Sequence, residues 1–251
     1  MWDNCFVSYR QPGMRHCTLI ITFMLALAVI PAQAEPGSDN SNRQINHMLR
    51  QAAQLGRMNH IRESIDFCNR ILAIDPNCGQ AFNIKGLGEV ALSQNKEGIR
   101  DLEQAIKLHG ADQQSYRTLE AAHVELNQLP QALAALTAGI NSVPLQQCDD
   151  EIVRERGEFY VMAHDYKKAL QDFSLAMKLK PEKATNWYCR GKAYFAMGEY
   201  EKAVQDFSKV IVMEPKNYRV YGMRANAYTK MGKIDLAERD KNKAKLGDID
   251  Y

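Results

Sequence analysis

The stretch ATNWYCRGKAYFAMGEYEKAVQDFSKVIVMEPKN, residues 184–217, is the clearest copy of a pattern that recurs in this sequence. The same pattern of small, aromatic and proline residues recurs along the chain at an interval of about 34 residues. Only the step to Asp150 needs three extra residues. The units begin at Ile45, Gly79, Gln113, Asp150, Ala184 and Tyr218. Self-similarity at a fixed period of this length predicts a repeat architecture.

Two positions of each unit carry small residues, which allow the two helices of the unit to pack closely. Two helices whose axes pass about 8–10 Å apart need small side chains where they cross, even though Gly weakens a helix. Position 20 is small in all six units, and position 8 is small in every unit except the third, where Glu120 predicts looser or locally adjusted packing. At position 20 stand Ser64, Gly98, Ala132, Ala169, Ala203 and Ala237; at position 8 stand Ala52, Gly86, Gly157, Gly191 and Ala225.

The end of each unit is equally regular. Position 32 is proline in four units, at Pro76, Pro144, Pro181 and Pro215, and Gly110 replaces it in the second. Proline cannot continue a helix, so each unit is predicted to be a helical hairpin.

The period and the pattern WxxxGxxYxxxGxYxxA…F…P resemble the tetratricopeptide repeat family over residues 45–251. The resemblance implies an all-α fold, a right-handed α-solenoid of about six tandem helix-turn-helix repeats that bury their apolar faces against one another. The expected repeats are 45–78, 79–112, 113–146, 150–183, 184–217 and 218–251.

Residues 1–34 do not fit the repeat. Arg10 and Arg15 precede the apolar run LIITFMLALAVI, residues 19–30, and Ala32-Gln33-Ala34 follows it. This order predicts a signal peptide at 1–34, followed by a flexible lead-in at 35–44, and a protein that is exported to the periplasm or secreted. The alternative is an uncleaved anchor, although the run is short for a hydrocarbon layer about 30 Å thick. Membrane contact is expected only if this segment is retained.

Composition and motifs argue against catalysis. The net charge of +2 without a long basic block gives no footprint for nucleic acid. The common hydrolase, nucleotide-binding and metal-binding motifs do not occur in the sequence. No enzyme activity, cofactor, metal or small-molecule substrate is therefore expected, and a protein or peptide partner is.

Helical geometry identifies the face on which a partner would bind. At about 100° per residue, positions 2, 5, 9 and 12 of each first helix point away from the packed core. In tetratricopeptide repeat proteins this face lines the concave groove that holds a partner segment. The residues expected to bind are Val124, Arg154, Val161, Tyr188, Lys192, Phe195, Arg219 and Asn226.

Several interpretations of the function remain open from sequence. The first is a non-catalytic interaction scaffold of the cell envelope that holds a partner segment in the groove. The second is an envelope assembly factor tethered by an uncleaved N-terminal anchor, and the third is a non-catalytic subunit of an enzyme complex. The alternative interpretation of the face formed by positions 2, 5, 9 and 12 is that it is ordinary solvated surface.

Overall fold

The structure is a computed structural model that describes residues 40–246. Within this range the chain forms twelve α-helices and one short 3-10 helix, and it has no β-strand. The chain divides into two compact units, of which the first ends at Gly139 and the second begins at Ile140.

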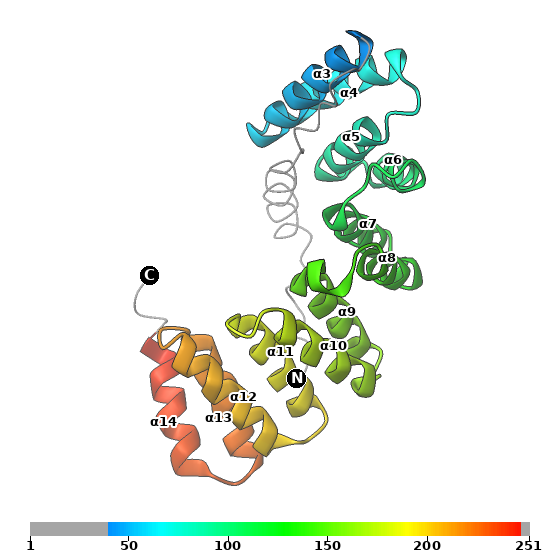
Figure 1. The fold of residues 1–251 in the computed structure, drawn as a ribbon. Helices are drawn as coiled ribbons and strands as arrows, with labels where there is room; N and C mark the ends of the chain where they lie inside the picture. The colour runs from blue at the N-terminus through cyan, green and yellow to red at the C-terminus, as the bar shows by residue number, and fades with distance from the viewer. Residues whose placement is uncertain (1–39, 247–251) are drawn as a thin grey trace. The chain divides into compact units, whose positions relative to one another are not determined.

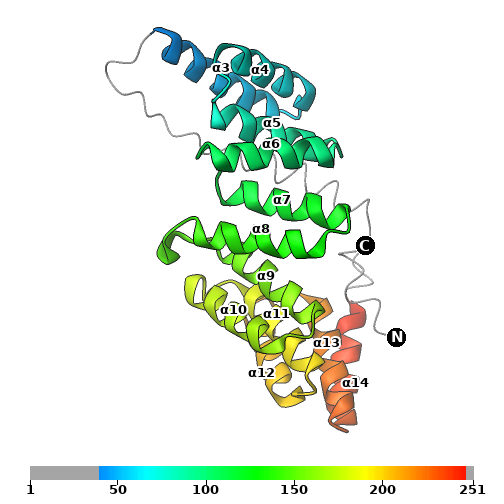
Figure 2. The same cartoon turned by 90° about the vertical axis from the view of Figure 1, so that its right-hand side faces the viewer.

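In the first unit, successive helices lie side by side as pairs (Figure 1). They are α3 (Asn40–Arg57), α4 (Ile61–Ile74), α5 (Gly79–Ala91), α6 (Asn95–Lys107), α7 (Gln113–Glu125) and α8 (Leu129–Asn141), whose last two residues belong to the second unit. The second unit has the same paired arrangement (Figure 2). It contains the 3-10 helix η1 (Leu145–Gln147), α9 (Asp150–Met162), α10 (Tyr166–Leu179), α11 (Ala184–Ala196), α12 (Tyr200–Met213), α13 (Tyr218–Lys230) and α14 (Ile234–Lys245). Five first helices begin at residues 79, 113, 150, 184 and 218, where the sequence places the starts of units.

The first described helix corrects the prediction of a flexible lead-in at 35–44. Residues 40–44 are helical, because α3 begins at Asn40. Asn and Ser favour turns, but they also favour the first positions of helices. Just beyond them, Ile45, Met48 and Leu49 are buried and give the helix an apolar face to pack. The predicted signal peptide and residues 35–39 lie outside the described residues.

No helix between residues 40 and 246 combines the length and the hydropathy that a membrane span requires.

The small residues predicted at the helix crossings lie in close contacts. A Cβ atom added to Gly98 would lie 2.5 Å from Val90 Cγ2, and one added to Gly191 would lie 2.8 Å from Phe207 Cε1. In α4, the Ser64 hydroxyl donates a hydrogen bond of 2.8 Å to the Ala52 carbonyl of α3. Larger side chains would push the paired helices apart. Glu120, the exception at position 8, is nevertheless buried.

Gly110 shows why one unit ends without proline. A Cβ atom at this position would lie 2.1 Å from the carbonyl carbon of Gly79. The chain after α6 therefore passes directly against the backbone at the start of α5, and a residue with a side chain does not fit there.

A repeated ion pair joins the two helices of each hairpin in the second unit. The guanidinium of Arg190 donates two hydrogen bonds of 2.8 Å to the two carboxylate oxygens of Asp206. Arg156 binds Asp172, and Arg224 binds Asp240, in the same two-pronged way. The three aspartates are buried, and bidentate Arg–carboxylate pairs are among the stronger polar contacts in proteins. These hydrogen bonds raise the pKa of each arginine further.

Candidate partner-binding surface

Helix α11 carries the central aromatic residue of the candidate surface. The helix begins at Ala184, after Pro181 has ended the preceding hairpin. Trp187 Nε1 donates a hydrogen bond of 3.2 Å to the Pro181 carbonyl, which fixes this turn to the first helical turn. One residue further, Tyr188 is half-buried, and its ring centroid lies 6.0 Å from that of the core residue Phe207.

Two cations lie close to the ring of Tyr188. Lys192 Nζ, one turn further along α11, is 5.4 Å from the ring centroid. Arg219 Cζ, from α13, is 5.8 Å from the same centroid. Cations at these distances are attracted to an aromatic ring by about 0.5–2 kcal/mol, depending on exposure. The Tyr188 ring therefore contacts a cation from α11 and a cation from α13.

A pocket of about 220 Å³ opens beside this ring. Apolar groups form part of its wall, and Thr185, Arg219, Glu214 and Asn217 supply polar groups. The apolar lining comes from Ala184, Tyr188, Val210 and Val220. Asn217 donates a hydrogen bond of 2.8 Å to Glu214, which holds that carboxylate at the turn before α13. The pocket is smaller than the roughly 300–1,000 Å³ of sites for drug-sized ligands, and its size suits a single side chain.

Two further predicted residues lie on the same two helices. Phe195 of α11 is half-buried and packs edge-on against Tyr200, with ring centroids 5.4 Å apart. Asn226 of α13 is exposed. We call Tyr188, Lys192, Phe195, Arg219 and Asn226 the Tyr188 face. Of these five residues, Arg219 and Asn226 are the most open to solvent, while Phe195 also serves the core.

The other three predicted residues are not available in the same way. Val161 was predicted to be an exposed anchor. It is buried instead, with 8% of its surface exposed. Arg154 is ion-paired with Glu155 and Glu158 at 3.8 and 3.4 Å, and only 16% of its side chain is exposed. Val124 is half-buried on α7, in the first unit, and is described there alone.

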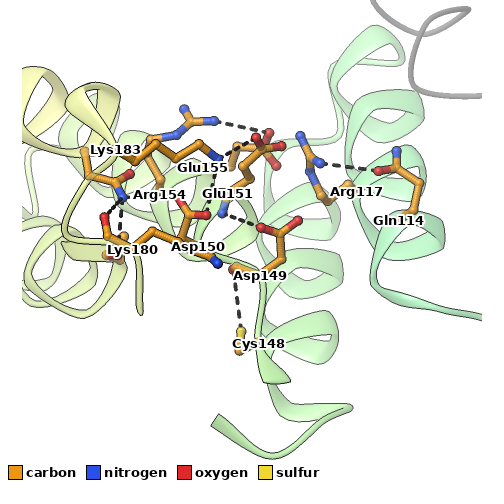
Figure 3. A network of polar contacts seen from close by, with 12 residues as sticks. Gln114, Arg117, Cys148, Asp149, Asp150, Glu151, Arg154, Glu155, Lys180 and Lys183 are labelled. Atoms are coloured by element: carbon orange, nitrogen blue, oxygen red, sulfur yellow. Dashed lines mark hydrogen bonds and ion pairs between the residues drawn. The ribbon is translucent and has the colours of Figure 1, made fainter. Parts of the chain in front are cut away.

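Sequence reasoning missed a polar network at the start of α9, shown in Figure 3. Lys183 Nζ lies 3.2 Å from Asp150 Oδ1 and 2.8 Å from Glu151 Oε1. Asn186 Nδ2 donates to Asp150 Oδ2 at 3.0 Å. Asp150 and Asn186 are buried, so this network ties the beginnings of α9 and α11 together. Its role is structural.

Sequence reasoning also missed the pocket residues Val210, Glu214 and Asn217. They belong to the second helix and the turn that close one repeat, and they meet position 2 of the next repeat, Arg219. Helical phase in the first helices alone could not reveal them. The signal available was their position at the end of the unit.

Two of the described cysteines, Cys68 and Cys189, do not offer reactive thiolates. Cys68 and Cys189 are buried, and burial raises the pKa of each thiol to about 12. Both thiols therefore stay protonated at neutral pH, whereas the nucleophile and the metal ligand is the thiolate. Among residues 40–246, no group of three or more potential ligand side chains could hold a metal ion.

The paired helices, their fixed period and the exposed face of first helices define a helical-repeat protein. Residues 184–217 match the family model of the tetratricopeptide repeat. A search of curated protein sequences gave no match. The structural comparisons agree with the repeat, and they show an all-α helical-repeat solenoid.

Three solved structures illustrate this likeness. The C-terminal part of a tetratricopeptide repeat protein from Cytophaga hutchinsonii shares 20% identity at a TM-score of 0.68, covering 78% of this chain and 77% of its own. MamA shares 21% identity at a TM-score of 0.59, covering 65% and 94%. YrrB, a tetratricopeptide protein with an unusual peptide-binding site, shares 20% identity at a TM-score of 0.59, covering 72% and 96%. Residues 184–217 therefore match a tetratricopeptide repeat by sequence, and the described helices share the fold of solved tetratricopeptide repeat structures.

Proposed function

We propose that this protein is a non-catalytic scaffold of the cell envelope that binds a segment of a partner protein on the Tyr188 face. Proteins with this fold commonly mediate contacts between proteins, and YrrB has a peptide-binding site. The five residues of the Tyr188 face include no carboxylate, histidine or thiol that could act as base or nucleophile. They do combine aromatic rings, positive charges and an amide, which suits recognition.

One observation supports the proposal most directly. Among the described residues Arg219 forms no ion pair, although it is exposed and stands beside the ring of Tyr188. The arginines of the hairpin cores, by contrast, are each held by an aspartate. An arginine that faces solvent next to an aromatic ring is a common anchor of protein interfaces, where Tyr, Trp and Arg carry most of the binding energy. The partner segment should carry an acidic group beside an apolar one.

Export is part of the same proposal. The support comes from the sequence, where a charged segment, an apolar run and Ala32-Gln33-Ala34 succeed one another. The partner is therefore sought among envelope proteins.

The test is capture of envelope proteins by the full chain and by two charge-reversal variants. Arg219→Glu changes the Tyr188 face, whereas Arg239→Glu makes the same change on the exposed surface of α14. Both variants should fold, because both side chains are exposed; a glutamate in the first turn of α13 also suits the helix dipole. We expect the specific partner to be lost with Arg219→Glu and retained with Arg239→Glu. A partner captured equally by both variants would place the binding surface elsewhere.

A further inference from the structure

The pocket beside Tyr188 has a counterpart one repeat earlier, where charged side chains meet. At that earlier boundary, Lys183 Nζ lies 3.2 Å from Asp150 Oδ1 and 2.8 Å from Glu151 Oε1. In the unit 150–183 these three residues stand at positions 34, 1 and 2. An ion-paired network therefore holds the beginning of α9 to the turn before α11.

In the next unit, 184–217, the same three positions carry Asn217, Ala184 and Thr185. None of these residues is charged, and Ala184 ends at its Cβ atom. The boundary between the last two hairpins therefore has a pocket of about 220 Å³, which all three residues line. The exchange of charged residues for small or neutral ones is the local reason for this pocket.

The walls of the pocket favour an aliphatic side chain. Val210 and Val220 are buried and line the pocket together with Tyr188. The Tyr188 ring already lies close to Phe207 and to two cations, so a further aromatic ring would compete with them for its faces. A Leu, Ile, Val or Met side chain needs no ring face. Its burial strengthens binding about tenfold or more.

The polar lining carries one charge of each sign. Arg219 lies beside the Tyr188 ring, is exposed and forms no ion pair among residues 40–246. Glu214 is also exposed, and the Asn217 amide donates a hydrogen bond of 2.8 Å to its Oε2 atom. The two charged groups therefore do not neutralise each other. A segment that carries a negative and a positive charge on either side of its apolar residue finds an opposite charge for both.

The spacing of these charges follows from the geometry of an extended chain. Successive side chains point to opposite faces, so residues two positions apart share a face and lie about 7 Å from each other. If the apolar residue enters the pocket, the residues two positions before and after it lie over the rim of the pocket. The matching pattern is acidic-x-aliphatic-x-basic, in one of its two chain directions.

We propose that the pocket takes an aliphatic side chain of an extended partner segment that carries an acidic residue two positions to one side and a basic residue two positions to the other. Arg219 binds the acidic residue and Glu214 binds the basic one. The inference rests on the proposed function, and it adds the kind of anchor and the need for a positive charge. Glu214 is then the residue that disfavours purely acidic segments.

Short peptides with blocked ends test this requirement on the full chain. Asp-Ala-Leu-Ala-Lys and Lys-Ala-Leu-Ala-Asp are titrated while the backbone amide NMR signals of Thr185, Tyr188 and Arg219 are followed. In the tighter-binding order, replacing Leu by Ser should weaken binding about tenfold or more, and replacing Lys by Asp should weaken it about fivefold. Glu214→Lys should reverse the second preference. The matched control Glu201→Lys, on the exposed surface of α12, should keep it.

A second variant closes the pocket without changing the net charge. Thr185→Glu with Asn217→Lys recreates the pairing of Glu151 with Lys183, and it should abolish the shifts caused by every peptide. Gln205→Glu with Asn242→Lys makes the same two charge changes on the exposed surfaces of α12 and α14 and should leave binding unchanged.

Any of four results would overturn the proposal. Neither Leu peptide shifts these amides, the Ser peptide binds as tightly as the Leu peptide, Glu214→Lys keeps the original preference, or the closed pocket still binds. Any of these together with loss of partner capture in Arg219→Glu would reject this inference and leave the proposed function intact. Partner capture that is insensitive to Arg219→Glu would reject the proposed function itself.

Discussion

At the scale of single residues, Glu89 is a carboxylic acid in an unfavourable, buried environment. It lies on α5 at the position that holds a tyrosine in the last three repeats, and its side chain is 8% exposed. Its Oε2 atom is buried without a hydrogen-bond partner. Lys85 is 3.7 Å away, but this lysine lies closer to Asp101, at 2.8 Å. Burial, followed by the charge of Asp101, raises the pKa of Glu89 to about 7.

This raised pKa makes stability depend on pH. Between its ordinary pKa of 4.5 and about 7, Glu89 holds a proton in the folded state and has lost it in the unfolded state. Its favourable contribution is therefore complete below 4.5 and is lost as the pH rises through 7. Glu89→Gln, which stays neutral, should gain about 3 kcal/mol relative to the wild type between about pH 4.5 and pH 8. Thermal unfolding of both proteins across this range checks it, and parallel curves would mean that Glu89 has an ordinary pKa.

At the scale of the helical hairpin, the Arg–Asp pairs are the feature with the clearest energetic consequence. Arg190 is 21% exposed, whereas Asp206 is only 4% exposed. The two partners are therefore not equivalent when one is removed. An arginine left alone can turn toward water, but an aspartate left alone stays buried with its charge uncompensated.

We expect Arg190→Met to lower the free energy of unfolding by about 3 kcal/mol and Asp206→Ala to lower it by about half as much. The double variant Arg190→Met with Asp206→Leu should recover most of the loss, because it leaves no buried charge. Urea unfolding of the full chain measures all three. Equal losses in the two single variants would contradict the asymmetry that we infer from burial.

The sequence predicted the hairpins but not these ion pairs. The small residues at positions 8 and 20 indicated where helices cross, and Gly191 and Gly98 lie in such contacts. The Arg–Asp pairs were equally visible, because the aspartate follows the arginine at one constant spacing in three units. Apolar periodicity does not reveal these pairs, since a charged residue inside a helix pattern is usually assigned to solvent.

The candidate surface was only partly predictable for a related reason. Helical phase places Val161 and Thr229 on the same face, yet Val161 is buried and Thr229 in the last hairpin is exposed. Phase describes one helix, whereas burial depends on what the other helices cover. Arg219 and Asn226, which belong to the last hairpin, are accordingly the predicted residues that solvent reaches best.

At the scale of the whole molecule, the period of the repeat was sufficient to predict the class of fold. The period, the small crossing residues and the terminal prolines are independent signals that agree, and such agreement makes a fold predictable. The identity of the partner is different, because the same repeat serves many unrelated functions. Only the chemistry of the exposed side chains carries that information.

The N-terminus provides a prediction at this scale. If residues 1–34 are a signal peptide, the protein isolated from its native source begins at Glu35. Intact mass spectrometry measures this directly. A mass that includes the apolar run at residues 19–30 would instead support the membrane-tethered alternative.

Site-specific photo-crosslinking can locate the partner that we place on the Tyr188 face. A photoreactive residue at Asn226 lies on that face, and one at Glu201 lies on the exposed surface of α12. We expect the captured partner to crosslink at position 226 and not at position 201. Crosslinking at position 201 without crosslinking at position 226 would show that the partner does not lie on the Tyr188 face.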